Sequence, residues 1–389
     1  DFFSQEFRLS SQFGDNIDYV IGLYYADADT DRQFARNPGL NIFSADWDAQ
    51  ASTESAAIFG QTTWQINQTT SITAGLRYNE EKISVDFTDN MLTPLAPLSG
   101  SDTDSAVVGN IALHYSPSDD VMLYARYAQG YKGQAYDIVT NFDQARLDNP
   151  AAPETSDSYE LGIKSMFLDQ RLRLNASIFY TEYDDFQAQS VVALPDGSTL
   201  MTLNNVGSLK TQGLEFEGEA LIGENLTLSF AASYIDAQIE EFDGANCYAG
   251  QTPGQGCVGG AQNISGGDLP NSPEWKYSLM ADYQAEFSDL PFDGFVNISW
   301  VWQDEVMFDL LQNPATKEDS YGVLDMSIGI NESENGRYRV TAFVNNVTDE
   351  NYRSTIGDVG LLYGGKTAFL QNFSRNSQRY AGVSVKMSF

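Results

Sequence analysis

Alternation of apolar and polar residues, repeated along the whole chain, is the dominant pattern of this sequence. The clearest examples are two runs, residues 72–79 and 171–180. Their apolar positions are Ile72, Ala74, Leu76, Tyr78, Leu172, Leu174, Ala176, Ile178 and Tyr180. Their polar or glycine intervening positions are Thr73, Gly75, Arg77, Asn79, Arg171, Arg173, Asn175 and Ser177. A side-chain period of two predicts β-strands that have one apolar face and one polar face.

Short stretches rich in Gly, Asn, Asp and Pro, residues typical of tight turns, join these runs in pairs. The pattern predicts seven hairpins followed by one last strand, about fifteen strands in all. The hairpins pair residues 4–13 with 17–34, 55–67 with 70–88, 104–116 with 121–137, 155–168 with 171–189, 198–222 with 226–242, 273–287 with 294–309, and 319–331 with 337–354, and the last strand covers 377–389.

Long polar segments separate the hairpins, so short turns and long loops alternate along the chain. The longest loops cover residues 35–53, 89–103, 138–154, 243–272 and 355–376. This alternation is typical of bacterial outer-membrane barrels, and a soluble β-sandwich has no reason for it. Arginine on the non-apolar face also favours a wet lumen, because an unpaired charge in a dry core is costly. The sequence therefore predicts an all-β fold, a transmembrane antiparallel β-barrel.

The strand count and the phase of the turns predict that further strands lie upstream of the sequence. A closed bacterial barrel has an even number of strands and both chain ends on the periplasmic side. If Phe389 is periplasmic, the short turns are periplasmic too, and residues 1–13 run inward from the extracellular face. We expect residues 1–389 to be the C-terminal portion of a larger barrel, because an open sheet edge in lipid leaves backbone groups unpaired.

Composition narrows the class of protein further. The chain has 54 acidic and 21 basic residues, a formal charge of −33, which argues against a nucleic-acid partner. The acidity fits either solvated loops or an attraction for cationic and metal-bearing ligands. No run of about 18 apolar residues occurs, so a spanning helix is excluded.

Few residues offer chemistry of their own. Cys247 and Cys257 lie in a Gly-rich polar stretch and are expected to form a structural disulfide in an oxidising compartment. His114 is the single histidine, which leaves little for zinc or general acid–base chemistry, and we expect a structural residue at the barrel rim. The sequence predicts a protein that is not an enzyme and needs no cofactor.

A calcium site is one interpretation of the run Asp27, Asp29 and Asp31, which share one face of a predicted strand near its external end. Three carboxylates at that spacing offer the oxygen ligands that Ca²⁺ takes. The alternative is a solvated strand end.

Several stretches, in this order, resemble signatures of the TonB-dependent receptor family of outer-membrane transporters. The resemblance covers most of residues 121–389. The stretches are VMLYARYAQGYKGQAYD (121–137), PETSDSYELGIKS (153–165), NVGSLKTQGLEFEGEA (205–220), LPNSPEW (269–275), FVNNVTDENY (343–352) and the C-terminal strand.

The resemblance implies a barrel of about 22 strands, a size at which the lumen is plugged. It also implies an N-terminal plug domain and a TonB-contacting segment, neither of which is in these residues, and a location in the bacterial outer membrane. The expected partners are TonB, outer-membrane lipid and lipopolysaccharide, and the barrel-assembly machinery. The assembly machinery is expected to read the final strand through Tyr380, Val383, Val385, Met387 and Phe389.

The implied function is active import of a scarce nutrient, a ferric siderophore-type chelate, with cobalamin and oligosaccharide as other cargoes of the family. A passive porin is the alternative, although a porin is expected to be complete with an even strand count. A soluble β-rich adhesin conflicts with the polarity of the strands, and no histidine-bearing region indicates haem.

Ligand contacts are expected where strands run into the external loops. Aromatic faces and hydrogen-bond donors there suit a chelate or a sugar. The candidates are Tyr131, Lys132, Gln134, Tyr136, Tyr352 and Arg353. The alternative is that these residues only pack the loops or form the interfacial girdle.

Overall fold

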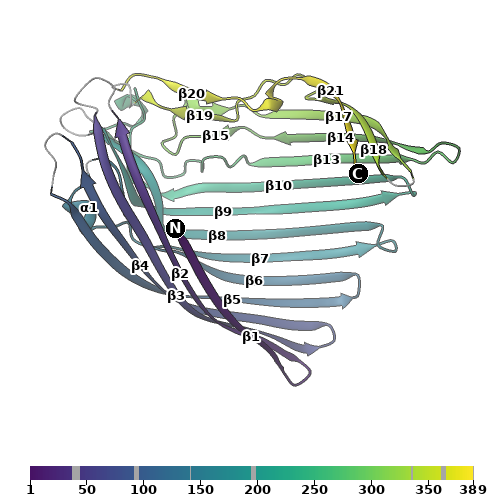
Figure 1. Cartoon of the computed structure of the whole chain (residues 1–389), viewed down its shortest axis with the longest axis horizontal. Helices are drawn as coiled ribbons and strands as arrows, with labels where there is room; N and C mark the ends of the chain where they lie inside the picture. The colour runs from purple at the N-terminus through teal and green to yellow at the C-terminus, as the bar shows by residue number, and fades with distance from the viewer. Residues whose placement is uncertain are drawn as a thin grey trace.

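One antiparallel sheet of 15 strands makes up most of the protein, and its spatial order follows the order of the chain (Figure 1). The computed structural model describes residues 1–36, 44–91, 96–140, 142–193, 199–333, 336–360 and 365–388. The strands of the sheet are β1 (Phe2–Phe13), β2 (Ile17–Arg36), β3 (Ala45–Asn67), β4 (Thr70–Asp89), β5 (Leu98–Ser118), β6 (Val121–Lys132), β7 (Glu154–Phe167), β8 (Leu172–Ala193), β9 (Thr199–Ile222), β10 (Leu226–Glu241), β13 (Trp275–Ala285), β14 (Phe292–Gln303), β17 (Tyr321–Glu332), β18 (Tyr338–Asn345) and β21 (Tyr380–Met387). The predicted strand count and the antiparallel architecture are confirmed.

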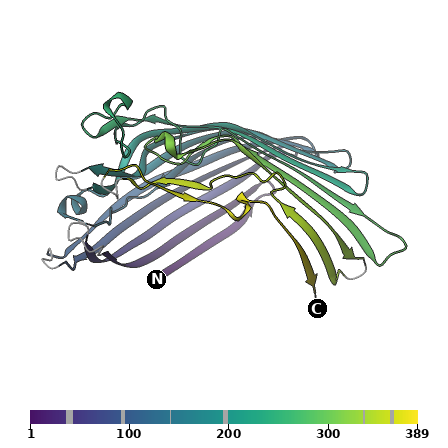
Figure 2. The same ribbon diagram turned by 90° about the horizontal axis from the view of Figure 1, so that it is seen from above.

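Short turns lie at one end of the sheet and long loops at the other, and the sheet is strongly curved (Figures 1 and 2). We call these the turn end and the loop end. The loops carry small elements of their own: α1 (Gln144–Asp148), the pairs β11 (Asp243–Asn246) with β12 (Ala261–Asn263), β15 (Val306–Met307) with β16 (Lys317–Glu318), and β19 (Thr355–Asp358) with β20 (Phe369–Asn372), and short 3₁₀ turns at Pro253–Gln255, Pro314–Thr316 and Arg375–Ser377. Within the described residues, no helix has the length and apolar character needed to cross a membrane.

The two faces of the sheet differ as the alternation predicts. Ile178 on β8 lies between Leu161 on β7 and Leu214 on β9, and all three side chains are more than half exposed. This apolar face continues across the sheet. Its exposed members include Leu23, Ile58, Leu76, Val107, Leu279, Ile328 and Val383. Such a surface is what strands present to lipid rather than to water.

The polar face carries charged and amide side chains that contact one another. Arg173 approaches Glu219 at 3.8 Å, and Asn175 donates a hydrogen bond of 2.6 Å to Glu217. Arg77 lies over the Tyr24 ring, 5.1 Å from its centroid, and donates to Asn79. The expectation that Arg77 and Arg173 avoid the apolar face is confirmed.

Arg171 corrects one detail of the predicted pattern, because it lies outside β8. Its guanidinium donates to the carbonyl oxygens of Leu221 and Gly223 in the neighbouring turn. A strand starting one residue later leaves Arg171 in the turn, where unpaired carbonyls accept its hydrogen bonds.

Aromatic rings on the polar face lie flat across glycines of the adjacent strand. A Cβ on Gly162 would stand 2.4 Å from the Tyr124 ring, and one on Gly382 would stand 2.7 Å from the Phe343 ring. A side chain at either position would therefore displace the ring. Glycine at these cross-strand sites therefore lets large rings cover the wall.

The strands nearest the N-terminus run further than predicted. Residues 35–53 and 89–103 are expected as loops, yet β3 begins at Ala45 and β5 at Leu98. The reason is that the large apolar residues move from one face of the sheet to the other. Near the loop end, the large apolar residues of β3 and β4 lie on the polar-face side, where Trp47, Val85 and Phe87 are buried against Phe142. These extensions therefore form a small soluble-type core above the lipid-facing region.

Other predicted strands are too long at the loop end. β6 ends at Lys132, β14 at Gln303 and β18 at Asn345, so Gln134, Tyr136, Tyr352 and Arg353 lie in loops. Asn346, at φ 52°, turns the chain away directly after β18. A non-glycine residue in the left-handed region marks such a break and is hard to recognise from alternation alone.

The C-terminal strand has the predicted polarity. Val383, Val385 and Met387 lie on the apolar face and are 70%, 62% and 49% exposed. Tyr380 pairs with Asn345 on the other face, and its hydroxyl accepts a hydrogen bond from the Asn345 amide. Phe389 lies outside the described residues, so its part in the expected assembly signal stays a prediction.

The assignment of the faces predicts opposite effects for arginine at two consecutive positions of β8. Ile178→Arg should reduce the folded protein in the cell envelope, because a lipid-facing arginine near the bilayer centre costs about 2–4 kcal/mol. Ser177→Arg should be tolerated, because Ser177 lies opposite Glu215. Heat-modifiable gel mobility of the envelope protein measures the folded fraction. Equal losses in the two variants would contradict the assignment.

Candidate functional site

The loop end of the sheet is where polar, aromatic and charged side chains from distant loops meet. Loops that follow β6, β10, β14 and β18 fold back over this end, and the three small two-stranded sheets lie there (Figure 1). Binding residues of β-barrels are expected at such a mouth, which a rigid wall supports. We call this region the mouth.

The first predicted ligand cluster is divided among separate contacts. The Tyr131 hydroxyl donates to Asp104 at 2.9 Å, and Lys132 forms an ion pair with Glu154 at 3.3 Å. Glu154 is a buried carboxylate and also accepts a hydrogen bond from the backbone N–H of Gln187. Both side chains therefore have partners within the protein, and a bound ligand would have to compete with these partners.

Gln134 and Tyr136 follow in a segment that packs onto the buried aromatic cluster of the mouth. The Gln134 Oε1 atom is buried without a hydrogen-bond donor near it among the described residues. The Tyr136 ring meets Phe142 edge-on at 6.4 Å, and burial, followed by the nearby Asp102 carboxylate, raises the pKa of Tyr136. Gln134 and Tyr136 thus belong to the packed part of this loop.

The second predicted cluster, Tyr352 and Arg353, lies in a network of its own. The Tyr352 ring stacks on Tyr321 with centroids 4.2 Å apart, and its hydroxyl accepts from Ser374 at 2.8 Å. Arg353 pairs with Glu318, whose side chain is only 7% exposed. No contact among the described residues joins this cluster to the first one. Ligand binding by either cluster stays a prediction.

The predicted disulfide between Cys247 and Cys257 is confirmed, with the two Cα atoms 5.7 Å apart. It closes a loop between β11 and β12. Gln262 on β12 donates to the carbonyl oxygens of Asn246 and Leu311, which ties this loop to the one after β14. The cross-link thus supports a structured part of the mouth.

The predicted calcium ligands Asp27, Asp29 and Asp31 do share one face of β2, opposite Glu54, Ser52 and Gln50 of β3. Across the described ranges, no three or more His, Cys, Asp or Glu side chains gather closely enough to hold a metal ion. Calcium binding by these residues stays a prediction.

A cavity of about 460 Å³ opens in the mouth between β8, β9 and the loops after β10 and β14. Most of its lining is apolar or aromatic. The lining residues are Tyr183, Phe186, Gln187, Ala188, Leu209, Thr211, Leu269, Pro270, Ser272 and Leu310. We call it the mouth cavity. Its volume lies in the range of about 300–1,000 Å³ that is usual for small-molecule pockets.

The sequence prediction did not include the mouth cavity, although the chain carries a signal for it. Tyr183 and Phe186 are three residues apart and cannot share one face of a regular strand. Asp185, at φ 54°, breaks the alternation between them and brings both rings to the cavity. The irregular run YDDF was the available signal.

The floor of the mouth cavity is rigid, because it belongs to a buried cluster. Leu209 is 2% exposed and packs with the fully buried Ile239. Backbone hydrogen bonds also join the two loops, from Asn271 to Met307 at 2.8 Å. The side chain of Gln312 bonds to the backbone of Asp268 through both its oxygen and its nitrogen.

A second cavity, of about 480 Å³, lies nearer the middle of the strands. Tyr124, Glu160, Glu215, Glu217 and Lys164 line part of it. The Tyr124 hydroxyl donates to Glu160, and Glu215 accepts from Ser177. The wall below the mouth therefore presents carboxylates toward the space that the sheet encloses.

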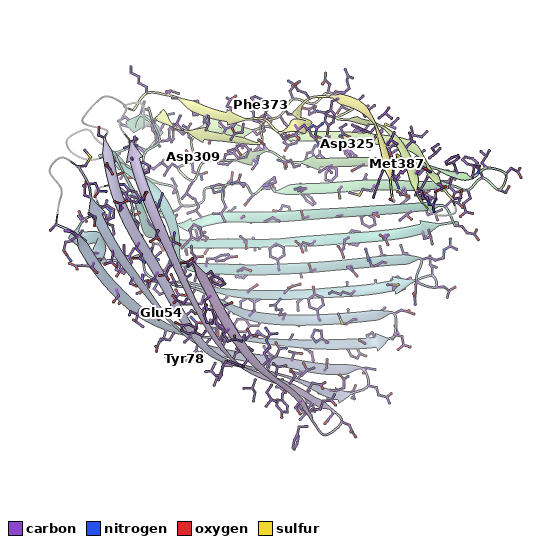
Figure 3. The ribbon with its side chains drawn as sticks, in the orientation of Figure 1. Glu54, Tyr78, Asp309, Asp325, Phe373 and Met387 are labelled. Atoms are coloured by element: carbon purple, nitrogen blue, oxygen red, sulfur yellow. A yellow bond between two sulfur atoms is a disulfide. The ribbon has the colours of Figure 1, made fainter. Side chains whose placement is uncertain are left out.

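Two carboxylates sit close together beside the mouth cavity. Asp309 accepts from the backbone N–H of Leu311 at 3.1 Å through one oxygen, while its other oxygen is buried without a donor (Figure 3). Burial raises the pKa of Asp309 above the ordinary value, and the nearby Asp358 charge raises it further. Hydrogen bonds from the backbone lower this pKa and offset part of the rise. Asp358 is itself held by Asn313 at 2.7 Å.

Comparisons with known proteins agree with this architecture. Residues 1–347 match the family model described as TonB dependent receptor-like, beta-barrel. The chain is 25% identical over 395 residues to the pesticin receptor of Yersinia enterocolitica, covering 99% of this chain and 51% of that protein. It is 23% identical over 342 residues to the probable TonB-dependent siderophore receptor PiuA of Acinetobacter baumannii, covering 84% and 43%.

Among solved structures, the ferric yersiniabactin uptake receptor FyuA of Yersinia pestis has the same fold. It superposes with a TM-score of 0.77 at 22% identity, over 99% of this chain and 54% of that one. The chain thus spans about half the length of the curated relatives it matches.

The raised pKa of Asp309 predicts a pH-dependent difference between the wild type and Asp309→Asn. A carboxyl whose pKa is raised on folding destabilises the folded state less when it is protonated. The wild type therefore has its full stability below the unfolded pKa and loses stability as the pH rises through the folded pKa. Asp309→Asn should stabilise the loop near neutral pH and make no difference below about pH 4, the ordinary aspartate value. Thermal unfolding of the purified protein at both pH values measures this, and a destabilised variant at pH 7 would contradict it.

Proposed function

This chain belongs to the TonB-dependent receptor family, since the family's barrel model matches residues 1–347, and we propose that it imports a ferric siderophore-type chelate across the bacterial outer membrane. Import would be active and driven through TonB. The observation that supports the proposal most is the match of the family's barrel model to residues 1–347. These residues form a sheet with one apolar face and one polar face. A transport wall with apolar residues outside and polar residues inside needs no catalytic set, so we propose transport and not catalysis.

The apolar face supports the membrane part of the proposal. Exposed Leu76, Leu161, Ile178 and Val383 would form a continuous lipid-facing band. Tyr25, Tyr78 and Tyr159 on the apolar face are 39%, 43% and 51% exposed. The hydroxyls of Tyr25 and Tyr78 donate to the carboxylates of Glu54 and Glu80, so these rings would reach the headgroup level, where the apolar face becomes polar. Outer-membrane lipid and lipopolysaccharide are therefore the proposed neighbours, and the barrel-assembly machinery is the proposed reader of β21.

The choice of an iron chelate rests on the relatives and on the mouth. The names of several relatives describe siderophore receptors, and the mouth cavity has the size and lining of a small-molecule site. Contact with TonB, and movement of a plug domain, belong to the whole protein of this family. We propose the TonB contact and the plug movement because the chain belongs to this family, and not from any residue described above.

Energy-coupled import predicts that uptake depends on the proton-motive force. Iron-starved cells that make the protein should accumulate ⁵⁵Fe from a matching ferric chelate, and accumulation should stop when a proton uncoupler is added. Cells that lack the gene should take up little of the chelate with or without the uncoupler. Uptake that requires the gene and continues undiminished with uncoupler would indicate passive diffusion and contradict the proposal.

A further inference from the structure

We propose that the mouth cavity receives an uncharged aromatic end of the imported ferric chelate, and that the mouth disfavours chelates with several free carboxylates. This inference rests on the proposed import of a ferric chelate and specifies its chemical class. Two independent features carry it. One is the lining of the mouth cavity, and the other is the neutralisation of the basic side chains around it.

The lining of the mouth cavity suits an aromatic ring. Tyr183 and Phe186 offer ring faces or edges, and Leu209, Leu269 and Leu310 offer aliphatic surface. Aromatic rings gain from offset or edge-on contacts with other rings in addition to the area they bury. Tyr183, Thr211 and Ser272 are the hydroxyl-bearing members of the lining, so a phenol or a heterocycle could also form a hydrogen bond there.

The mouth cavity is largely formed before any ligand arrives. Its Leu209 wall belongs to the buried cluster, and Leu269 and Leu310 pack against the same cluster. The backbone N–H of Leu269 donates to Ala237 of β10 at 3.0 Å, which fixes that loop to the sheet. A site that needs little ordering retains more of its contact energy as affinity.

Several basic side chains of the mouth are paired with acids. Lys132 meets Glu154 at 3.3 Å, and Arg146 meets Asp137 at 3.3 Å. The two carboxylate side chains are only 11% and 10% exposed, so these pairs are held within the protein. Burial raises the pKa of Asp137 and its Arg146 partner lowers it, so the ion pair opposes the effect of burial.

Two further ion pairs lie in the mouth, Lys317 with Glu305 and Arg353 with Glu318. Arg32 lies over the Trp47 ring and Arg375 over the Tyr380 ring rather than beside an acid. Lys276 and Lys366 also have no acid partner among the described contacts. A chelate with several free carboxylates needs a group of donors with net positive charge, usually arginines. The formal charge of −33 and the carboxylates Asp309 and Asp358 act against such a ligand.

Lys132 also links the charge argument to the mouth cavity. Its ammonium lies 6.0 Å from the centroid of the Phe186 ring, and Glu154 neutralises it. A neutral aromatic group can therefore occupy the cavity without meeting a net charge. Removing the acid would leave an uncompensated cation beside the ring.

Direct binding measurements on the full protein, purified from outer membranes, test this inference. The probes are three ferric complexes, of a hydroxyphenyl-thiazoline carboxylic acid, of the hydroxamate desferrioxamine, and of citrate. Quenching of tryptophan fluorescence reports binding. The hydroxyphenyl complex should bind at least about 10-fold more tightly than the citrate complex, the scale on which apolar pockets discriminate.

Phe186→Ala should weaken binding of the ferric hydroxyphenyl complex about 10-fold and leave binding of the citrate and hydroxamate complexes unchanged. Phe373→Ala is the matched control, because Phe373 is 60% exposed and is not among the lining residues (Figure 3). The control should change none of the three affinities. If Phe186→Ala fails to reach the membrane, Leu310→Ala removes apolar lining from a different loop and should have the same selective effect.

Glu154→Gln tests the charge argument separately. Glutamine keeps an acceptor for the Gln187 N–H but leaves Lys132 without its counter-charge. Citrate binding should rise several-fold in this variant, and the preference for the hydroxyphenyl complex should shrink.

The outcomes separate the two proposals. An equal loss of affinity for all three complexes in Phe186→Ala would overturn the inference while leaving the proposed ferric chelate import intact. A wild type that binds the citrate complex most tightly would do the same. If none of the three complexes binds and none is taken up by iron-starved cells, the proposed function itself is contradicted, and the inference falls with it.

Discussion

Hydrogen bonding of the backbone in a medium without water is the constraint on which the rest of the structure depends. In hydrocarbon nothing but the protein itself can pair an N–H or a C=O, and a sheet closed into a barrel is one of two solutions. Pairing fixes the side chains in alternation, so neighbours such as Ser177 and Ile178 meet opposite surroundings. Lipid requires apolar residues on one face, and the enclosed space admits polar ones only when they are paired or hydrated.

Pairing on the polar face follows from that second requirement. Arg173 has Glu219, and Asn175 has Glu217, each on the adjacent strand where register places them directly opposite. The same rule holds in the mouth, where Lys132 has Glu154. Among the described residues of this wall, acids thus neutralise several basic side chains, in agreement with the strongly acidic composition of the chain. This pairing is one reason why we propose that the mouth selects a ligand by shape and apolar contact more than by attraction.

The sequence predicted the features that depend on strict alternation, and failed where alternation changes. Strand number, order, the two ends and the faces around Ile178 all follow from a period of two. On β4 the apolar residues move from Leu76 and Tyr78 to Val85 and Phe87, on the other face. That shift was visible in the sequence, but its meaning needed the buried partner Phe142, which is far away in the chain. Ring and ion-pair partners such as Tyr321 for Tyr352 are equally non-local.

The shift of apolar residues between faces also explains why the mouth cavity lies where it does. Below the shift, lipid holds the large side chains outside; above it, water surrounds the strands and the same side chains gain more by packing inward. On β9 and β10 the change separates the exposed Leu214 from the buried Leu209 and Ile239. Loops can then fold onto that inward core, and a cavity remains where a break at Asp185 spoils regular packing. The proposed level of the membrane surface thus coincides with the point on the wall above which an inward-facing cavity forms.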